Sequence, residues 1–151
     1  MKKQQPSNQE PVLSSKGRIL SLDVGIKRTG IARSDVLQTI ATPVGAVETP
    51  KVFQYLKNLF LSEPFVKIIV GWPVNLKGET GQSTEMVERF IQSLKKELPG
   101  MEIETLDERF TSLMAQQSIR SSGVSKKRRQ EKGLVDAVAA AILLQDYLDR
   151  N

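Results

Sequence analysis

Hydrophobic residues occur along the chain both as short continuous runs and as stripes with helical spacing. The compact apolar run Arg18–Val24 stops at Gly25, which is typical of a central strand. Residues 84–98 carry apolar side chains three and four positions apart, which predicts an amphipathic helix. The same reasoning predicts strands over 29–34, 39–47, 65–70 and 101–106, and helices over 51–61, 112–120 and 134–148.

The order of these elements predicts an α/β fold. Three strands come first with short turns between them, and such turns make antiparallel hairpins. The later strands alternate with helices, which can carry the chain across to a parallel neighbour. We therefore expect a five-stranded mixed sheet, with three antiparallel N-terminal strands followed by parallel strands, flanked by helices. Ligands of such sheets gather at the carboxyl ends of the strands.

Residues 1–16 differ in composition from the rest of the chain. They are rich in Lys, Gln, Ser and Pro and have few large apolar side chains, so we expect a flexible N-terminal tail followed by one domain over 17–151. They also lack a secretory apolar region. The longest apolar run, 135–144, contains Asp136 and is much shorter than the roughly 20 residues of a membrane span. We expect a cytoplasmic protein with no membrane partner.

The chain contains neither cysteine nor histidine. It therefore has no disulfide, no Cys/His zinc site, no Ser-His-Asp triad and no thiol nucleophile. Any hydrolytic chemistry must rest on carboxylates, lysines, hydroxyls or a metal ion. Carboxylates are hard ligands that suit Mg²⁺ or Mn²⁺, and these ions favour phosphate substrates.

The balance of charge favours an anionic partner. Lysine and arginine total 22 against 17 aspartates and glutamates, which gives a net charge of +5. Such an excess attracts nucleic acid, although it also serves simply to keep a small protein soluble.

Three carboxylates are candidates for this chemistry. Asp23 closes the first strand beside Gly25, whose missing side chain would let a ligand approach the backbone; the alternative is a turn-forming aspartate. Glu108 follows a strand, where it could instead cap the next helix. Asp136 lies in a helix that is apolar nearly all round, where a charge is costly unless it is paired, capped or bound to a metal.

If these three side chains converge, they could share one or two divalent ions. Paired ions of this kind can activate water and stabilise the leaving oxygen of a phosphodiester without any histidine. We therefore treat Asp23, Glu108 and Asp136 as candidate metal ligands and catalytic residues. The alanines around Asp136 would let its helix approach the sheet closely.

Basic residues lie near these acids in the sequence. Lys27 and Arg28 occupy the turn after Asp23, Arg109 follows Glu108, and Lys127 and Arg128 belong to a basic stretch, 126–132, before Asp136. They are candidate contacts for a phosphate backbone, although a run of charge is also common in a solvated loop. Trp72 and Phe110 could stack on bases, but single aromatics are more often part of a core.

Four stretches, in order, resemble the YqgF family of Holliday-junction-resolvase-like proteins, also described as pre-16S rRNA nucleases. They are LDVGIKRTGIA at 22–32, GWP at 71–73 with Gly78 and Gly81, DERFTS at 107–112, and VDAVAA at 135–140 with Leu144-Gln145. The resemblance covers nearly everything after Gly17. Ser112 and Trp72 depart from the usual pattern, which has threonine and leucine there, and neither change removes a carboxylate.

The resemblance implies an RNase H-like fold in which Asp23, Glu108 and Asp136 bind Mg²⁺ or Mn²⁺ and act in catalysis. It also implies maturation of the 5′ end of 16S rRNA, with precursor rRNA, and ribosomal particles, as partners. Branched DNA is the alternative substrate, which would make the protein a Holliday-junction-type resolvase.

Two other function classes remain open. A noncatalytic nucleic-acid-binding module would show salt-sensitive binding without cleavage. A sugar-kinase or actin-like nucleotide-binding lobe would bind ATP, but such proteins need two lobes and 151 residues supply one. The sequence leaves open whether the protein is a monomer or a homodimer, and whether one or two metal ions bind.

Overall fold

The computed structural model describes residues 17–73, 82–108, 111–121 and 132–150. Every predicted strand and helix is present, with ends that differ by a few residues. In chain order they are β1 (Arg18–Val24), β2 (Arg28–Ser34), β3 (Ala41–Glu48), the 3₁₀ helix η1 (Thr49–Lys51), α2 (Val52–Ser62), β4 (Phe65–Pro73), α3 (Gln82–Glu97), β5 (Glu102–Glu108), α4 (Thr111–Ser121) and α6 (Lys132–Arg150).

The five strands form one mixed sheet in the order β3-β2-β1-β4-β5. β1 pairs antiparallel with β2, and β2 with β3, whereas β1–β4 and β4–β5 are parallel. This confirms the predicted arrangement of three antiparallel N-terminal strands followed by parallel ones. β5 is longer than expected, because Asp107 and Glu108 remain paired with Trp72 and Pro73. Glu108 therefore belongs to the strand and does not follow it.

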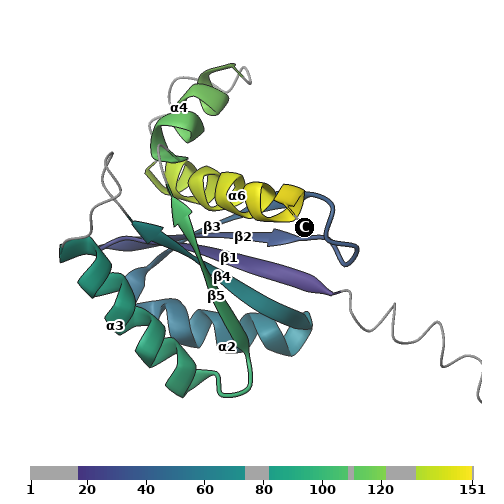
Figure 1. Ribbon diagram of the computed structural model, residues 1–151, viewed down its shortest axis with the longest axis vertical. Helices are drawn as coiled ribbons and strands as arrows, with labels where there is room; N and C mark the ends of the chain where they lie inside the picture. Colours follow the sequence, from purple (N-terminus) through teal and green to yellow (C-terminus); the bar gives the residue numbers. More distant parts are fainter. Residues whose placement is uncertain (1–16, 74–81, 109–110, 122–131, 151) are drawn as a thin grey trace, which may run out of the picture.

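Helices cover both faces of the sheet (Figure 1). α2 and α3 lie on one face, and the core there is built from large aliphatic side chains of the central strands. Its fully buried members include Leu20, Leu22, Ile31, Ile68 and Val70. α6 lies on the other face, chiefly over β2 and β3, and α4 packs on the side of α6 away from the sheet.

The core under α6 combines alanines with large apolar side chains. It contains Ile19, Ala32, Ile69, Ala140 and Leu144, together with neighbours from the same helix. Strand alternation assigns each residue of β1 to one core or the other, because successive side chains point to opposite faces. Leu20, Leu22 and Val24 enter the α2 and α3 core, and Ile19 enters the α6 core.

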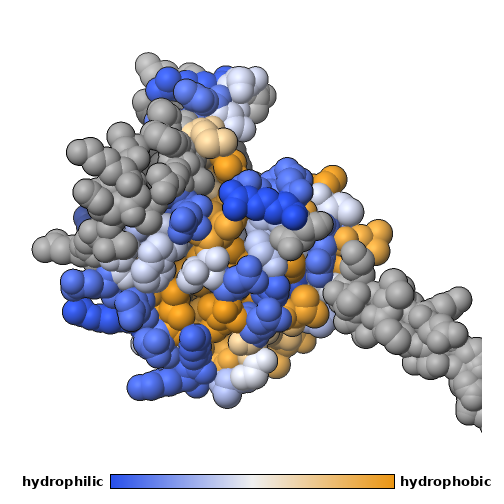
Figure 2. All heavy atoms as spheres, in the orientation of Figure 1, coloured by the Kyte–Doolittle hydropathy of each residue, from blue (hydrophilic) through white to orange (hydrophobic). Residues whose placement is uncertain are grey.

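The surface reflects this layering. In Figure 2, hydrophilic residues cover the outer side of α3, and hydrophobic ones show between α3 and α6. Among the helices of the described ranges, none is both long and apolar enough to cross a membrane.

Candidate active site

Asp23 lies near the end of β1 with its side chain on the α6 side of the sheet. Leu22 and Val24 on either side of it are buried in the opposite core, so alternation directs Asp23 towards α6. Ser21, two residues earlier on the same face, is fully buried, and its Oγ donates a hydrogen bond of 2.7 Å to the carbonyl oxygen of Ala140 in α6.

This hydrogen bond fixes how Asp136 sits relative to Asp23. Asp136 precedes Ala140 by four residues, roughly 6 Å along a helix, and Asp23 follows Ser21 by two residues, roughly 6–7 Å along a strand. Since α6 runs antiparallel to β1, the two displacements point the same way. Asp136 therefore lies over the same end of the sheet as Asp23.

Gly30 allows this close approach. It pairs with Asp23 across the β1–β2 ladder, and a Cβ atom at Gly30 would collide with the carbonyl oxygen of Asp136. Any larger residue would push the start of α6 away from the sheet. Gly30 is therefore the point at which the helix backbone rests on β2.

Glu108 reaches Asp23 across β4. Leu22 pairs with Val70, so extending that register by one residue places Asp23 beside Gly71. A Cβ atom at Gly71 would collide with the Oε2 atom of Glu108. The missing side chain lets the Glu108 carboxyl lie over β4, where it hydrogen-bonds with that of Asp23.

Burial and the neighbouring carboxylates change the protonation of Asp23. Burial, then the charge of Glu108 and the hydrogen bond with it, then the charge of Asp136, raise the pKa of Asp23 from 3.8 to about 8. At neutral pH, Asp23 thus keeps a proton that it presents to Glu108. A cation bound to the pair would relieve the same repulsion.

Asp136 has a cationic partner within the site. The Nε atom of Arg28, the first residue of β2, lies 2.8 Å from its Oδ2 atom. Both side chains are partly exposed, at 35% for Arg28 and 27% for Asp136. The sequence predicts a substrate contact for Arg28, and the structure gives it this partner, so the substrate contact stays a prediction.

The donor atoms of the site suit a hard divalent cation. Three carboxylates against one guanidinium carry a formal charge of −2 when all are ionised, which one Mg²⁺ or Mn²⁺ would balance. No three acidic side chains of the described ranges surround one point as a ready-made metal site. Asp23 and Glu108 already meet, whereas Asp136 is paired with Arg28.

The β1–β2 turn is built around Thr49, which the sequence analysis did not single out. The Oγ1 atom of Thr49 donates to the carbonyl oxygen of Gly25 at 2.6 Å, and its amide donates to that of Lys27 at 2.9 Å. A Cβ at Gly25 would lie 2.6 Å from the carbonyl oxygen of Arg28. The expectation that Gly25 leaves room for a ligand is therefore wrong, because the turn itself fills that room.

The structure places some of the other residues that the sequence suggested as nucleic-acid contacts, and others lie outside the part that it describes. The side chain of Lys27 is exposed at the turn, and Trp72 is half-buried against the core, which agrees with its structural interpretation. Arg109, Phe110, Lys127 and Arg128 lie outside the described residues. Gly30 and Gly71 were quoted only as parts of motifs, although glycine inside a strand signals a close approach of another group.

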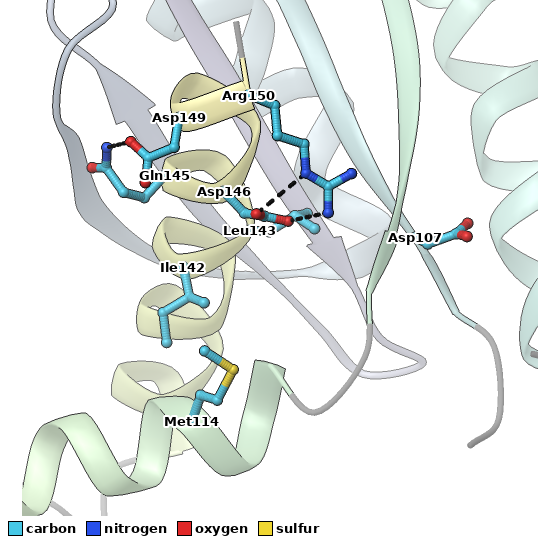
Figure 3. Close-up of a pocket in the computed structure, with 8 residues that line it drawn as sticks. All are labelled: Asp107, Met114, Ile142, Leu143, Gln145, Asp146, Asp149 and Arg150. Carbon is cyan, nitrogen blue, oxygen red and sulfur yellow. Dashed lines mark hydrogen bonds and ion pairs between the residues drawn. The ribbon is translucent and has the colours of Figure 1, made fainter. Parts of the chain in front are cut away.

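A cavity of about 650 Å³ lies elsewhere, between the end of β5, α4 and α6. Figure 3 shows its lining: Asp107, Met114, Ile142, Leu143, Gln145, Asp146, Asp149 and Arg150. Asp107 points away from the α6 side chains, and Arg150 pairs with Asp146 at 2.9 Å. With three carboxylates and one guanidinium, this lining disfavours a phosphate backbone. Asp23, Glu108 and Asp136 are not part of this lining, although Asp107 is the neighbour of Glu108 in β5.

Comparisons with known proteins agree on a family. A family model described as RuvX, Holliday junction resolvase, matches residues 17–150. A relative from Flavobacterium psychrophilum named "Putative pre-16S rRNA nuclease" is 45% identical over 133 residues, covering 88% of this chain and 97% of the relative. A relative of the same name from Bacteroides fragilis is 42% identical over 132 residues, covering 87% and 96%.

A solved structure supports the fold. T. thermophilus RuvC in complex with Holliday junction substrate matches with a TM-score of 0.54 at 14% identity, covering 89% of this chain and 95% of that one. At this identity the likeness concerns the fold, which is RNase H-like.

Proposed function

The chain belongs to the RuvX family of Holliday junction resolvases, and from this premise we propose that it is a nuclease that hydrolyses phosphodiester bonds in structured nucleic acid. The observation that carries the proposal is the hydrogen-bonded pair Asp23 and Glu108, with Asp136 over the same end of the sheet. A carboxyl pair of this kind needs a proton or a cation between its members, and phosphodiester hydrolysis by histidine-free sites uses a cation.

We assign the binding of Mg²⁺ or Mn²⁺ to these three carboxylates. When bound, such an ion supplies positive charge for the phosphate oxygens and lowers the pKa of water. Asp23 and Glu108 hold adjacent oxygens on β1 and β5, and Asp136 offers a third from α6. Because all three come from regular elements, their positions relative to the substrate change little during the reaction.

We propose precursor 16S rRNA, near its 5′ end, as the substrate, because relatives above 40% identity over most of both chains carry that name. Action on this RNA would bring the protein to ribosomal particles in the cytoplasm. The net charge of +5 supports a polyanionic partner. The second candidate is a four-way DNA junction, which the family description favours.

A cleavage assay tests the proposal. The purified chain is incubated with a labelled precursor rRNA fragment or a labelled four-way DNA junction, each with and without Mn²⁺. We expect metal-dependent cutting of the RNA, and a loss of about a thousandfold or more in Asp23→Asn and Glu108→Gln. Glu102→Gln is the matched control, because Glu102 is exposed on the same strand and pairs with Lys67.

The alternatives give different results. Cutting of the junction but not the RNA would establish the DNA resolvase. Binding of either substrate without cutting, at every Mn²⁺ concentration, would favour the noncatalytic module. If Asp23→Asn cut as fast as the unchanged protein, the three-carboxylate site would be wrong.

A further inference from the structure

Arg28 holds an unusual place for a residue expected to meet substrate. Its Nε–H points at Oδ2 of Asp136 at 2.8 Å, which joins the start of β2 to the first half of α6. Among the residues that the structure describes, this is the only ion pair of Asp136. The carboxylate that must complete the acidic trio is therefore already occupied by a cation from the protein itself.

The position of Arg28 makes that cation removable. Arg28 precedes Gly30 by two residues on the same face of β2, so its Cα lies roughly 6–7 Å nearer the mouth of the site. Its side chain is 35% exposed. A guanidinium at a partly solvated rim can turn outward into water without being stranded in an apolar environment.

The negative charge of the three carboxylates gives a reason for the ion pair between Arg28 and Asp136. Asp136 adds to the repulsion that acts on Asp23, and Glu108 adds more. A guanidinium on Asp136 neutralises one of the three carboxylates and so reduces that repulsion. A divalent ion shared by all three would do so more completely, and it would compete with the Arg28 guanidinium for the negative charge of Asp136.

We infer that Arg28 is a positioning residue that serves as a built-in counter-ion for Asp136, and that a divalent cation binds the acidic trio only by displacing this guanidinium. The inference rests on the proposed metal-dependent function. It adds a competition between Arg28 and the metal ion for one carboxylate, which sets how tightly the ion is held.

Mn²⁺ binding to the full chain without nucleic acid, measured by isothermal titration calorimetry, tests the inference. R28Q should bind Mn²⁺ about three- to tenfold more tightly, because no ion pair must be broken. R28K, which keeps the charge, should remain within about twofold of the unchanged protein. Arg33→Gln is the matched control on the same strand, since Arg33 pairs instead with Glu63 at 2.6 Å, and it should leave the affinity unchanged.

A double substitution separates competition from general electrostatics. Removing a positive charge anywhere near the site attracts a cation, whereas competition acts only through Asp136. In an Asp136→Asn background, R28Q should therefore change Mn²⁺ affinity by less than about twofold. A gain that persists in full in that background, or no gain in R28Q at all, overturns the inference.

Asp23→Asn distinguishes this failure from failure of the proposed function. If Asp23→Asn binds Mn²⁺ as well as the unchanged protein does, the metal site itself is wrong. If Asp23→Asn loses binding while R28Q has no effect, the metal site stands and only the role of Arg28 is refuted.

Discussion

The same strands present different kinds of side chains to the two faces of the sheet. On the α2 and α3 face, β1 presents Leu20, Leu22 and Val24 to a core of large aliphatic side chains. On the α6 face, the same strand presents one large aliphatic residue, Ile19, followed by Ser21 and Asp23. The neighbouring strands show the same contrast, because Ile31 and Val70 fill the first core while Gly30 and Gly71 face the helix.

This difference shows how a small fold can separate stability from chemistry. Large side chains hold α2 and α3 away from the strands and bury apolar area. Small residues let the α6 backbone contact the sheet directly, so that a carbonyl of the helix can accept from Ser21 and Asp136 can stand over the strand ends. On the α6 face, polar groups held in defined positions therefore replace part of the apolar packing.

The largest effect should come from opening a cavity on the first face. Leu22 is fully buried, and Leu22→Ala should lower the free energy of unfolding by about 2–5 kcal/mol. Cleavage per folded molecule should stay within about threefold, because Asp23 is held from the other face. Urea unfolding followed by circular dichroism gives the first number, and the cleavage assay gives the second. A large loss of cleavage in the folded variant would mean that the two faces are not separable.

Substitution of the next residue, Asp23, should change the free energy of unfolding in the opposite direction. Asp23→Asn removes the buried charge but keeps an N–H that can donate to Glu108, so it should raise the free energy of unfolding by about 2 kcal/mol at pH 8. Asp146→Asn, at the exposed end of α6, is the control and should change little. A destabilised Asp23→Asn would show that this carboxyl supports the fold.

The pH dependence follows from the same shift. The pKa of Asp23 is about 8 in the folded protein against 3.8 without its neighbours. Between pH 4 and 8 the folded state therefore holds a proton that the unfolded chain has lost, and raising the pH across this window lowers stability. Because the chain has no histidine, few other groups titrate there. Asp23→Asn should flatten the slope, and an unchanged slope would contradict the assignment.

A smaller effect should distinguish the two glycines that flank Asp23. A Cβ at Gly30 meets the backbone of α6, whereas one at Gly71 meets the end of the Glu108 side chain. Gly30→Ala should therefore cost about 1–3 kcal/mol of stability, and Gly71→Ala less than about 1 kcal/mol, because a side chain can turn aside. Both should reduce cleavage by about tenfold or more. Equal stability losses would mean that Glu108 is held as rigidly as the helix backbone.

The sequence predicted the elements and their order well because their signals are local. The run Arg18–Val24 and the spacing around Phe90 each determine one element with no information from elsewhere. The convergence of Asp23 and Glu108 also followed, since both stand at carboxyl ends of strands. The ion pair of Arg28 with Asp136 did not follow, because it joins residues 108 positions apart and depends on how far α6 descends onto Gly30.

The smallest expected effect concerns the bond that positions α6. Ser21→Ala removes a buried donor to the Ala140 carbonyl but leaves that carbonyl inside a helix, where it keeps its intrahelical partner. We expect a loss of about 1 kcal/mol, with cleavage reduced no more than about threefold because Gly30 still seats the helix. Ser62→Ala removes the same kind of bond, at 3.0 Å, from an exposed helix end and should cost almost nothing. If Ser21→Ala abolished cleavage while remaining folded, this one hydrogen bond, and not the small-residue packing, would be what places Asp136.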